Sequence, residues 1–321
     1  MNLTELRPLS LGELLDRTFS SYRQHFWSFV GIMAIPQLIL VALQLMQQTL
    51  LRPFMTARSA IGAFNVTLIA GMVGGSLIVM ALYGLVYSAA LGATTLAVSE
   101  FYLGRSITIG QAYGRLRGRF WKLIATMTLQ VLCGLGLFAV PVAIFAMMIA
   151  VMPHRNEGTA TVVIVGVIFA LASIGAGIAA VMLALRLALS VPALVLENVS
   201  PVDAIKRSFK LTKGYTGRIF VIGLLVGLIA MIAVVVFQMP FIIATILVAV
   251  KHGVVAFWLT SAMTVSQGIG VTLSAPLGLI AMALAYYDTR VRNEGLDLQL
   301  MMSALGESAP PGTQPGSPAP V

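Results

Sequence analysis

The residues that could carry out chemistry are few and widely spread in this chain. It has three histidines, His25, His154 and His252, and one cysteine, Cys133. Metal-assisted hydrolysis needs several carboxylate or imidazole ligands that converge on one site. The sequence holds no His-Glu-x-x-His, no phosphate-binding loop that ends in Gly-Lys-Ser/Thr and no Gly-x-Ser-x-Gly. We therefore expect no catalytic site, no metal site, no cofactor and no enzymatic activity.

The composition is that of an all-α integral membrane protein. Hydrophobic residues make up 59% of the chain and charged residues 10%, whereas about a quarter of the residues in soluble domains are charged. Long uncharged runs predict six transmembrane helices, because one span needs about 20 apolar residues. The predicted spans cover residues 27–51, 59–99, 123–153, 159–196, 219–250 and 253–287. Together they form a membrane domain over residues 27–287.

Three polar stretches have the pattern of capped amphipathic helices. Each begins with a side chain that can cap a helix, has an acid or amide three residues later, and has an arginine at the same distance from the cap. The three sets are Ser10, Glu13 and Arg17; Thr108, Gln111 and Arg115; and Ser200, Asp203 and Arg207. We predict an N-terminal amphipathic helix within residues 1–26 and surface helices near 108–120 and 200–213. The fold is then three repeats of an amphipathic surface helix plus a transmembrane hairpin.

The basic residues indicate the orientation. Fifteen of the 20 Lys and Arg residues lie on the side of the two termini. The exceptions are Arg52, Arg58, Arg155 and Lys251 in the opposite loops and Arg186 inside a span. Because positively charged loops stay in the cytoplasm, we expect a protein of the cell inner (plasma) membrane with both termini cytoplasmic. Residues 288–302 then form a cytoplasmic segment, and residues 303–321, rich in Pro, Gly and Ser, a disordered tail.

Arg186 is the first candidate for a functional residue, because it is the one charge inside a predicted span. Counted back from Glu197 along one continuous helix, it lies about 16 Å deep, near the middle of the bilayer. An arginine there costs at least about 2.5 to 3.5 kcal/mol and should face a partner inside the bundle. Two interpretations stay open: a structural clasp onto backbone freed by Pro192, or a site for an anionic ligand or ion.

The other candidates lie in the stretch that follows Arg186. Glu197 pairs with Arg207, caps a neighbouring helix, or takes part in binding. The residues Val202, Ile205, Phe209 and Thr212 share an apolar helix face. The basic cluster consists of Lys206, Arg207, Lys210 and Lys213. It either grips anionic lipid head groups or only marks the cytoplasmic side of the membrane.

Three segments carry a resemblance to a known family. They are RPLSLGELLDRTFSSYRQHFW, VPALVLENVSPVDAIKRSFKLTKG and YYDTRVRNEGLDLQL. Over nearly all of residues 7–300, the chain resembles the membrane-domain family of bacterial glycerophosphoryl diester phosphodiesterases. Fused members of that family carry a metal-dependent phosphodiesterase barrel after the membrane part. We expect a stand-alone member without this catalytic domain, so the resemblance does not imply its activity.

These observations lead to two functional hypotheses. The first is a membrane scaffold or accessory factor that contacts anionic lipid, a protein partner or a second copy of the chain at the cytoplasmic face. Nucleic acid is not an expected partner, since the net charge of +9 is spread over short loops beside apolar runs. The alternative is a transporter or channel for a small anion or lipid-like solute, with Arg186 as counter-charge. A polar cavity that reaches Arg186 would favour transport, and protein acceptors around Arg186 would favour the scaffold.

Overall fold

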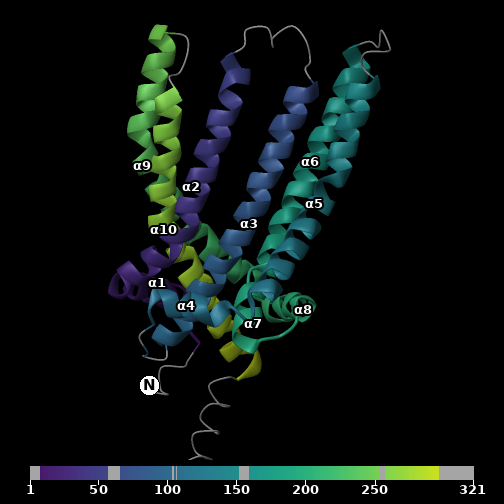
Figure 1. Cartoon of the computed structure of the whole chain (residues 1–321). Coiled ribbons are helices and arrows are strands. Elements are labelled where there is room, and N and C mark those ends of the chain that lie inside the picture. The colour runs from purple at the N-terminus through teal and green to yellow at the C-terminus, as the bar shows by residue number, and fades with distance from the viewer. Residues whose placement is uncertain are drawn as a thin grey trace, which may run out of the picture.

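The fold is a bundle of long helices with short helices at one end. The computed structural model describes residues 8–56, 66–102, 105, 107–151, 159–252 and 257–295. In these ranges the long helices are α2 (Phe26–Thr56), α3 (Val66–Tyr102), α5 (Phe120–Val151), α6 (Thr159–Leu187), α9 (Thr216–His252) and α10 (Phe257–Glu294). The short helices are α1 (Leu11–Gln24), α4 (Ile109–Leu116), α7 (Ser190–Glu197) and α8 (Pro201–Thr212). The short helices gather at one end of the bundle (Figure 1), which we call the charged end.

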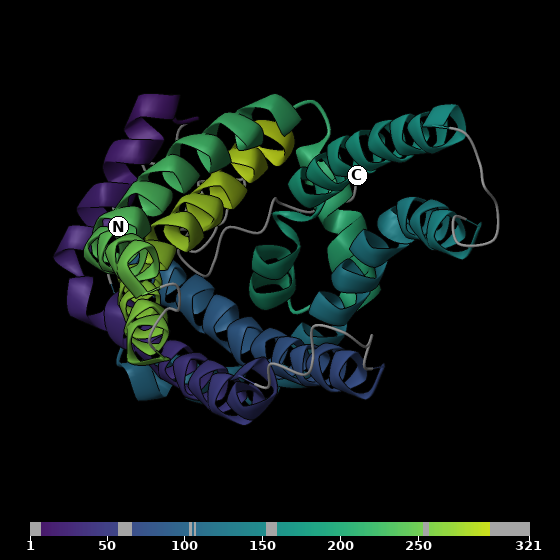
Figure 2. The same cartoon turned by 90° about the horizontal axis from the view of Figure 1, so that it is seen from above.

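The long helices form an open arrangement when the bundle is seen from above. Helices α9 and α10 run as a closely packed pair on one side, and α5 and α6 form a second pair on the other side (Figure 2). Helix α10 also packs against α2, α3 and α1, whereas α5 packs against α3. Between the two pairs, α6 contacts α9, and at the charged end α7 and α8 lie against α10.

The outer surface of the bundle is apolar, as a membrane requires. By length and composition, five stretches of the described residues can cross a membrane: four lie in α2, α5, α9 and α10, and one combines α6 with α7. The second expected span falls on α3, a single helix of 37 residues that is not among the five, so the count of six stays a prediction. Trp27, Trp121 and Trp258 stand exposed within the first two residues of α2, α5 and α10. Tryptophan at helix ends is typical of membrane interfaces.

The short amphipathic helices begin at the predicted caps. In α1 and α4 both hydrogen bonds of a capping box are formed, by Ser10 with Glu13 and by Thr108 with Gln111. In α8 the Ser200 hydroxyl accepts the Asp203 N–H. These three predictions are confirmed. Helix α4 is shorter than expected, however, because it ends at Leu116 and residues 117–119 form a turn into α5.

The prediction of one continuous helix over residues 159–196 is wrong. Helix α6 ends at Leu187 and α7 begins at Ser190. Pro192 accounts for the break, because it has no N–H to bond the Ala188 carbonyl and its ring would collide with that carbonyl. Arg186 therefore lies in the last turn of α6, about 40 Å along the helix from Thr159. Since the hydrocarbon core is about 30 Å thick, a helix that enters at one membrane face reaches the other face before Arg186.

The end of the chain also differs from the expectation. Helix α10 continues to Glu294, so the segment predicted to leave the membrane at residue 288 begins inside this helix. Residues 296–302, the tail 303–321 and residues 1–7 lie outside the described residues. The same holds for the loops 57–65, 152–158 and 253–256.

Tyrosines of two short helices bond the backbone of proline-bent long helices. Pro36 in α2 leaves the Ile32 carbonyl without its helical donor, and the Tyr113 hydroxyl of α4 donates to that carbonyl at 2.7 Å. The Tyr22 hydroxyl of α1 donates at 2.6 Å to the Leu273 carbonyl, close to the proline of α10. Burial raises the pKa of Tyr113 to about 12, so this hydroxyl keeps its proton across the neutral pH range. Tyr113 thus satisfies a carbonyl that Pro36 leaves open, and Tyr22 adds a bond to the backbone of α10 one residue after the carbonyl that Pro276 leaves open.

We predict that Tyr113→Phe lowers the free energy of unfolding by about 1 kcal/mol, a typical value for a hydrogen bond between membrane helices. In a Pro36→Ala background the same change should cost less than half as much, because alanine restores an N–H donor for Ile32. Denaturant unfolding of the full chain in mixed micelles measures both differences. Tyr215→Phe is the control, since the Tyr215 hydroxyl bonds no residue that the structure describes. An equal cost in both backgrounds would contradict this interpretation.

Candidate functional site

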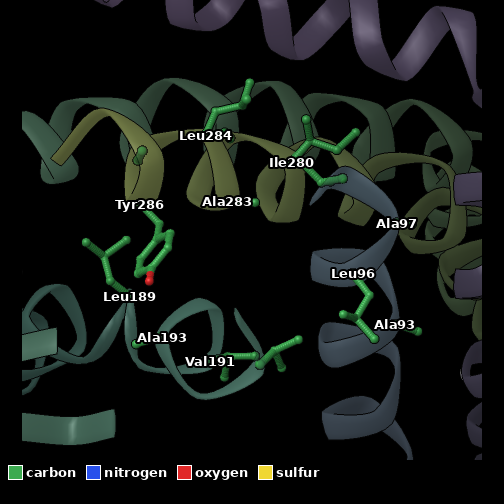
Figure 3. Packing of buried hydrophobic residues seen from close by; sticks show 14 of the residues in the cluster. Ala93, Leu96, Ala97, Leu189, Val191, Ala193, Ile280, Ala283, Leu284 and Tyr286 are labelled. Atoms are coloured by element: carbon green, nitrogen blue, oxygen red, sulfur yellow. The ribbon is translucent and has the colours of Figure 1, made fainter. Parts of the chain in front are cut away.

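The last turns of α10 lie at the centre of the charged end. Tyr286 is fully buried, and Asp288 is 3% exposed. Figure 3 shows this part of the core, where side chains of α10, α3 and the α6–α7 connection meet, with Tyr286 beside Leu189. The hydrophobic cluster continues to α1, α4 and α8 through Leu14, Leu116 and Leu211. The polar groups of α10 are therefore held in a tightly packed environment.

The first group of charged residues surrounds Glu197, at the end of α7. The Arg207 Nε of α8 donates to both Glu197 oxygens at 3.0 and 2.9 Å, and the Tyr286 hydroxyl donates to Glu197 Oε1 at 2.6 Å. Arg207 also binds Glu294 with both terminal nitrogens, and Arg290 Nε lies 3.1 Å from Glu294 Oε2. We call these five residues the Glu197 cluster. Its two arginines and two glutamates balance in charge.

The hydrogen bonds hold Arg207 in its charged form. Its bond to Glu294, joined by its bond to Glu197, raises the pKa of the Arg207 guanidinium, although partial burial acts against them. Bidentate bonds between a guanidinium and a carboxylate fix both distance and angle. Arg207 makes such a pair of bonds with Glu294 and shares its Nε–H between the two oxygens of Glu197, so it joins α7, α8 and α10.

The second group surrounds Asp288, whose side chain is only 1% exposed. Its Oδ1 accepts the Leu9 N–H at 2.8 Å, and Arg292 Nε lies 3.1 Å from both of its oxygens. Arg218 Nε of α9 lies 3.0 Å from Asp288 Oδ2, oriented for an ion pair but not for a hydrogen bond. Both arginines also donate to the Leu9 carbonyl, at 2.5 and 2.6 Å. This Asp288 cluster ties the segment before α1 to α9 and α10.

A third set of contacts joins α4 and α5 to their neighbours. Arg115 of α4 pairs with Glu100 of α3 at 2.5 Å. In the connection to α5, Arg119 donates to the Val195 carbonyl of α7 at 2.5 Å. Lys122 lies 3.4 Å from the Asn198 side-chain oxygen. Arginine contacts thus brace α4, α7 and α8 at the charged end, and Asp288 holds the segment before α1.

This arrangement suits bracing rather than catalysis. The three carboxylates of the two clusters, those of Glu197, Glu294 and Asp288, are bonded to arginine, so none of them is free to act as a base. Within the described ranges, no three His, Cys, Asp or Glu side chains come together in a group that could hold a metal ion. The expectations of no metal, no cofactor and no enzymatic activity stay predictions.

Of the predicted site residues, Glu197 and Arg207 are brought together and Arg186 is not part of either cluster. Arg186 is partly exposed, and its side chain makes no hydrogen bond or ion pair with the residues that the structure describes. The clasp on the broken backbone comes instead from Ser208 of α8. Its hydroxyl donates to the Arg186 carbonyl at 2.6 Å and accepts the Leu189 N–H at 3.2 Å. The Arg186 side chain thus forms no clasp with the described residues, and both interpretations of Arg186 stay predictions.

The basic cluster is divided by the structure. Arg207 turns inward to the carboxylates, whereas Lys206, Lys210 and Lys213 are exposed. The predicted apolar face of α8 is also wrong in part, since Val202 and Phe209 are exposed and Ala204, Ser208 and Leu211 are buried with Thr212. Small side chains at Ala204 and Ser208 let α8 approach the break between α6 and α7 closely. The sequence prediction rested on hydrophobicity alone, and it therefore placed the larger residues Val202 and Phe209 on the packed face.

A cavity of about 440 Å³ lies between α3, α5, α6, α7 and α10. Its lining is mostly apolar, with a polar contact between Gln130 and Ser190 on one wall. Arg186 is not among its lining residues. This cavity is therefore not a polar cavity that reaches Arg186, and the Arg186 side chain has no protein acceptor among the described residues. The choice between transport and scaffolding stays open on these two criteria.

Sequence reasoning missed the Asp288 cluster and the cavity. One signal for the cluster was present, because Asp288 and Arg292, and Arg290 and Glu294, are opposite charges four residues apart. Such pairs are typical of a helix that continues. The contact with Leu9 joins residues at opposite ends of the chain, and no local pattern indicates it. The cavity depends on how five helices pack, which the sequence does not display.

We predict that Asp288→Asn lowers the free energy of unfolding by about 3 kcal/mol, because it leaves two arginines facing each other without a carboxylate. Residues 8–24 should also become cleavable by added protease. The matched control is Glu100→Gln, whose partner Arg115 is 54% exposed, and it should cost less than about 1 kcal/mol. Thermal unfolding and limited proteolysis in nanodiscs measure both effects. Equal losses for the two variants would show that Asp288 has no special role.

The comparison with known proteins agrees with this picture of the membrane part. Residues 167–304 match the model of the membrane domain of glycerophosphoryl diester phosphodiesterase. No curated protein and no solved structure matches the chain. The matched residues include Glu197 and Asp288, the carboxylates at the centres of the two clusters. The resemblance of the residues before 167 to this family stays a prediction. Over residues 167–304, which are less than half of its length, the chain is therefore similar to the membrane-domain family of glycerophosphoryl diester phosphodiesterases.

Proposed function

We propose that this chain is a non-enzymatic membrane scaffold or accessory factor whose charged end lies on anionic lipid of the cytoplasmic leaflet. The observation that carries the proposal is an exposed stripe on α8. Val202, Lys206, Phe209 and Lys213 are all exposed and follow one another at helical spacing. Apolar side chains between lysines are typical of helices that lie in a membrane interface. We call these four residues the α8 stripe.

The opposite face of α8 is fixed to the bundle, which supports this proposal. Arg207 is bound by two glutamates, Ser208 bonds the backbone of the α6–α7 connection, and the Leu211 carbonyl accepts a bond from Asn293 at 3.1 Å. A helix held in this way presents its lysines without losing much further conformational freedom on binding. The α8 stripe is thus a preorganised surface.

The order of the acid contacts supports a chain of three units with six spans. Glu100 at the end of α3 holds Arg115 of α4, and Glu197 at the end of α7 holds Arg207 of α8. Asp288 near the end of α10 holds the backbone before α1. In each case the acid at the end of one unit binds the surface helix, or its preceding segment, of the next unit. The contact between Asp288 and the segment before α1 thus links the third unit to the first.

Both termini and all surface helices lie on the cytoplasmic side in this proposal, as the distribution of basic residues favours. An anionic cytoplasmic leaflet attracts nearby lysines by about 1 kcal/mol for each residue. The alternative of an anion transporter receives no support from the cavity, because its lining is mostly apolar and omits Arg186.

We predict that anionic lipid protects α8 from hydrogen exchange in nanodiscs, compared with nanodiscs of neutral lipid. Lys206→Gln together with Lys213→Gln should remove about 2 kcal/mol of this stabilisation. It should also weaken in 1 M salt, where the screening length falls to about 3 Å. Hydrogen exchange followed by mass spectrometry over residues 201–212 is the measurement.

The control variant is Lys251→Gln, which removes an exposed lysine at the opposite end of α9. It should leave the protection of α8 unchanged. The proposal is contradicted if neutral and anionic nanodiscs give the same exchange in α8, or if the double variant keeps the full difference between them. If α8 is protected only when a second protein is added, the α8 stripe binds a protein partner rather than lipid.

A further inference from the structure

The cavity lies next to the break between α6 and α7. One wall is formed by Leu183, Leu187 and Pro192, on both sides of the break, and other walls by residues of α3, α5 and α10. Its volume of about 440 Å³ is within the range of small-molecule sites, about 300 to 1,000 Å³. Apolar cavities do not hold ordered water well. Inside a membrane, the apolar group at hand to fill such a space is a lipid acyl chain.

Arg186 lies beside this cavity on α6. It follows Leu183 by three residues and precedes Leu187 by one, and both of those side chains line the cavity. Residues three apart are neighbours on a helix surface. On its other flank, Val181 and Met182 are about half exposed on the lipid-facing surface. Arg186 therefore borders both the cavity and the surrounding lipid.

The charge of Arg186 has no counterpart in the described part of the chain. A guanidinium near the membrane boundary is stabilised by an anion, and it binds phosphate oxygens with two parallel hydrogen bonds. The carboxylates of the Glu197 and Asp288 clusters are already bound by other arginines. A lipid phosphate would supply the missing negative charge.

We propose that the protein binds one anionic phospholipid here, with an acyl chain in the cavity and the phosphate at Arg186. The inference goes beyond surface contact with lipid, and it does not depend on the α8 stripe. It requires only that the helices stand in a membrane. The apolar cavity accommodates an acyl chain, and Arg186 favours a head group with a net negative charge.

Gly134 offers a way to fill the cavity without disturbing its walls. Gly134 lines the cavity, and a Cβ atom built on it meets no atom of the described residues within 4 Å. Gly134→Leu should therefore place a side chain in the cavity while the bundle stays folded. Gly136 is equally open but is exposed and does not line the cavity. Gly136→Leu is thus a matched control on the same helix.

The experiment is native mass spectrometry of the delipidated full chain, titrated with phosphatidylglycerol, phosphatidylcholine or inorganic phosphate. The wild type should bind one phosphatidylglycerol about tenfold more tightly than phosphatidylcholine, a difference of about 1.4 kcal/mol. Both lipids carry a phosphate, but the choline ammonium cancels its charge in phosphatidylcholine and weakens the attraction to Arg186. Gly134→Leu should lose binding of both lipids by about tenfold, and Ala184→Leu, on the α6 wall, is a second variant of this kind. Arg186→Gln should lose the preference but keep weak binding of both.

Three controls keep the outcomes distinct. Gly136→Leu and Arg117→Gln, which removes an exposed arginine of the charged end, should bind as the wild type does. The double change at Lys206 and Lys213 should also keep the bound lipid, so failure of the surface proposal would not be mistaken for failure of this one. The inference is overturned if Gly134→Leu and Ala184→Leu, both folded, retain the lipid, or if the wild type does not distinguish the two head groups. Binding of inorganic phosphate that persists in Gly134→Leu would assign Arg186 to a free anion instead.

Discussion

A buried carboxylate at the end of a membrane helix is the constraint on which this structure depends. Asp288 is almost fully enclosed, and an unpaired charge in such a place costs several kcal/mol. Its partners come from three places in the chain: the backbone of Leu9, Arg218 at the start of α9, and Arg292 one turn further along α10. The helix pair α9 and α10 and the segment before α1 must therefore assemble together. Glu197 imposes the same requirement on α7, α8 and α10.

The long helices are shaped by proline, and the short helices complete them. Proline removes a backbone hydrogen bond, which in lipid must be replaced by another donor. Tyr113 of α4 supplies such a donor to the Ile32 carbonyl of α2, and the hydroxyls of Tyr22 and Ser208 bond backbone carbonyls near the prolines of α10 and α7. The short helices thus fix the bends as well as the ionic contacts. With most bracing at one end, the long helices diverge from it (Figure 1). The cavity is lined by residues of α3, α5, α6, α7 and α10.

The sequence predicted local features well and distant contacts poorly. The caps at Ser10, Thr108 and Ser200 depend on neighbours three residues away, and the Glu197–Arg207 pair lies within one short stretch. The break before Pro192 was missed because a proline can bend a membrane helix or end it. The outcome depended on Ser208, which bonds both sides of the break. The bond from Leu9 to Asp288 joins residues 279 positions apart, and only the folded chain brings them together.

The most direct test of this account is hydrogen exchange of the wild-type protein at increasing denaturant. If the Glu197 and Asp288 clusters hold the charged end together, then α1, α7, α8 and the last turns of α10 form one cooperative unit. Their slowest amides should open with the same free energy and the same dependence on denaturant. The account is contradicted if α1 or α8 opens far more easily than α10, because the clusters would then not couple these helices.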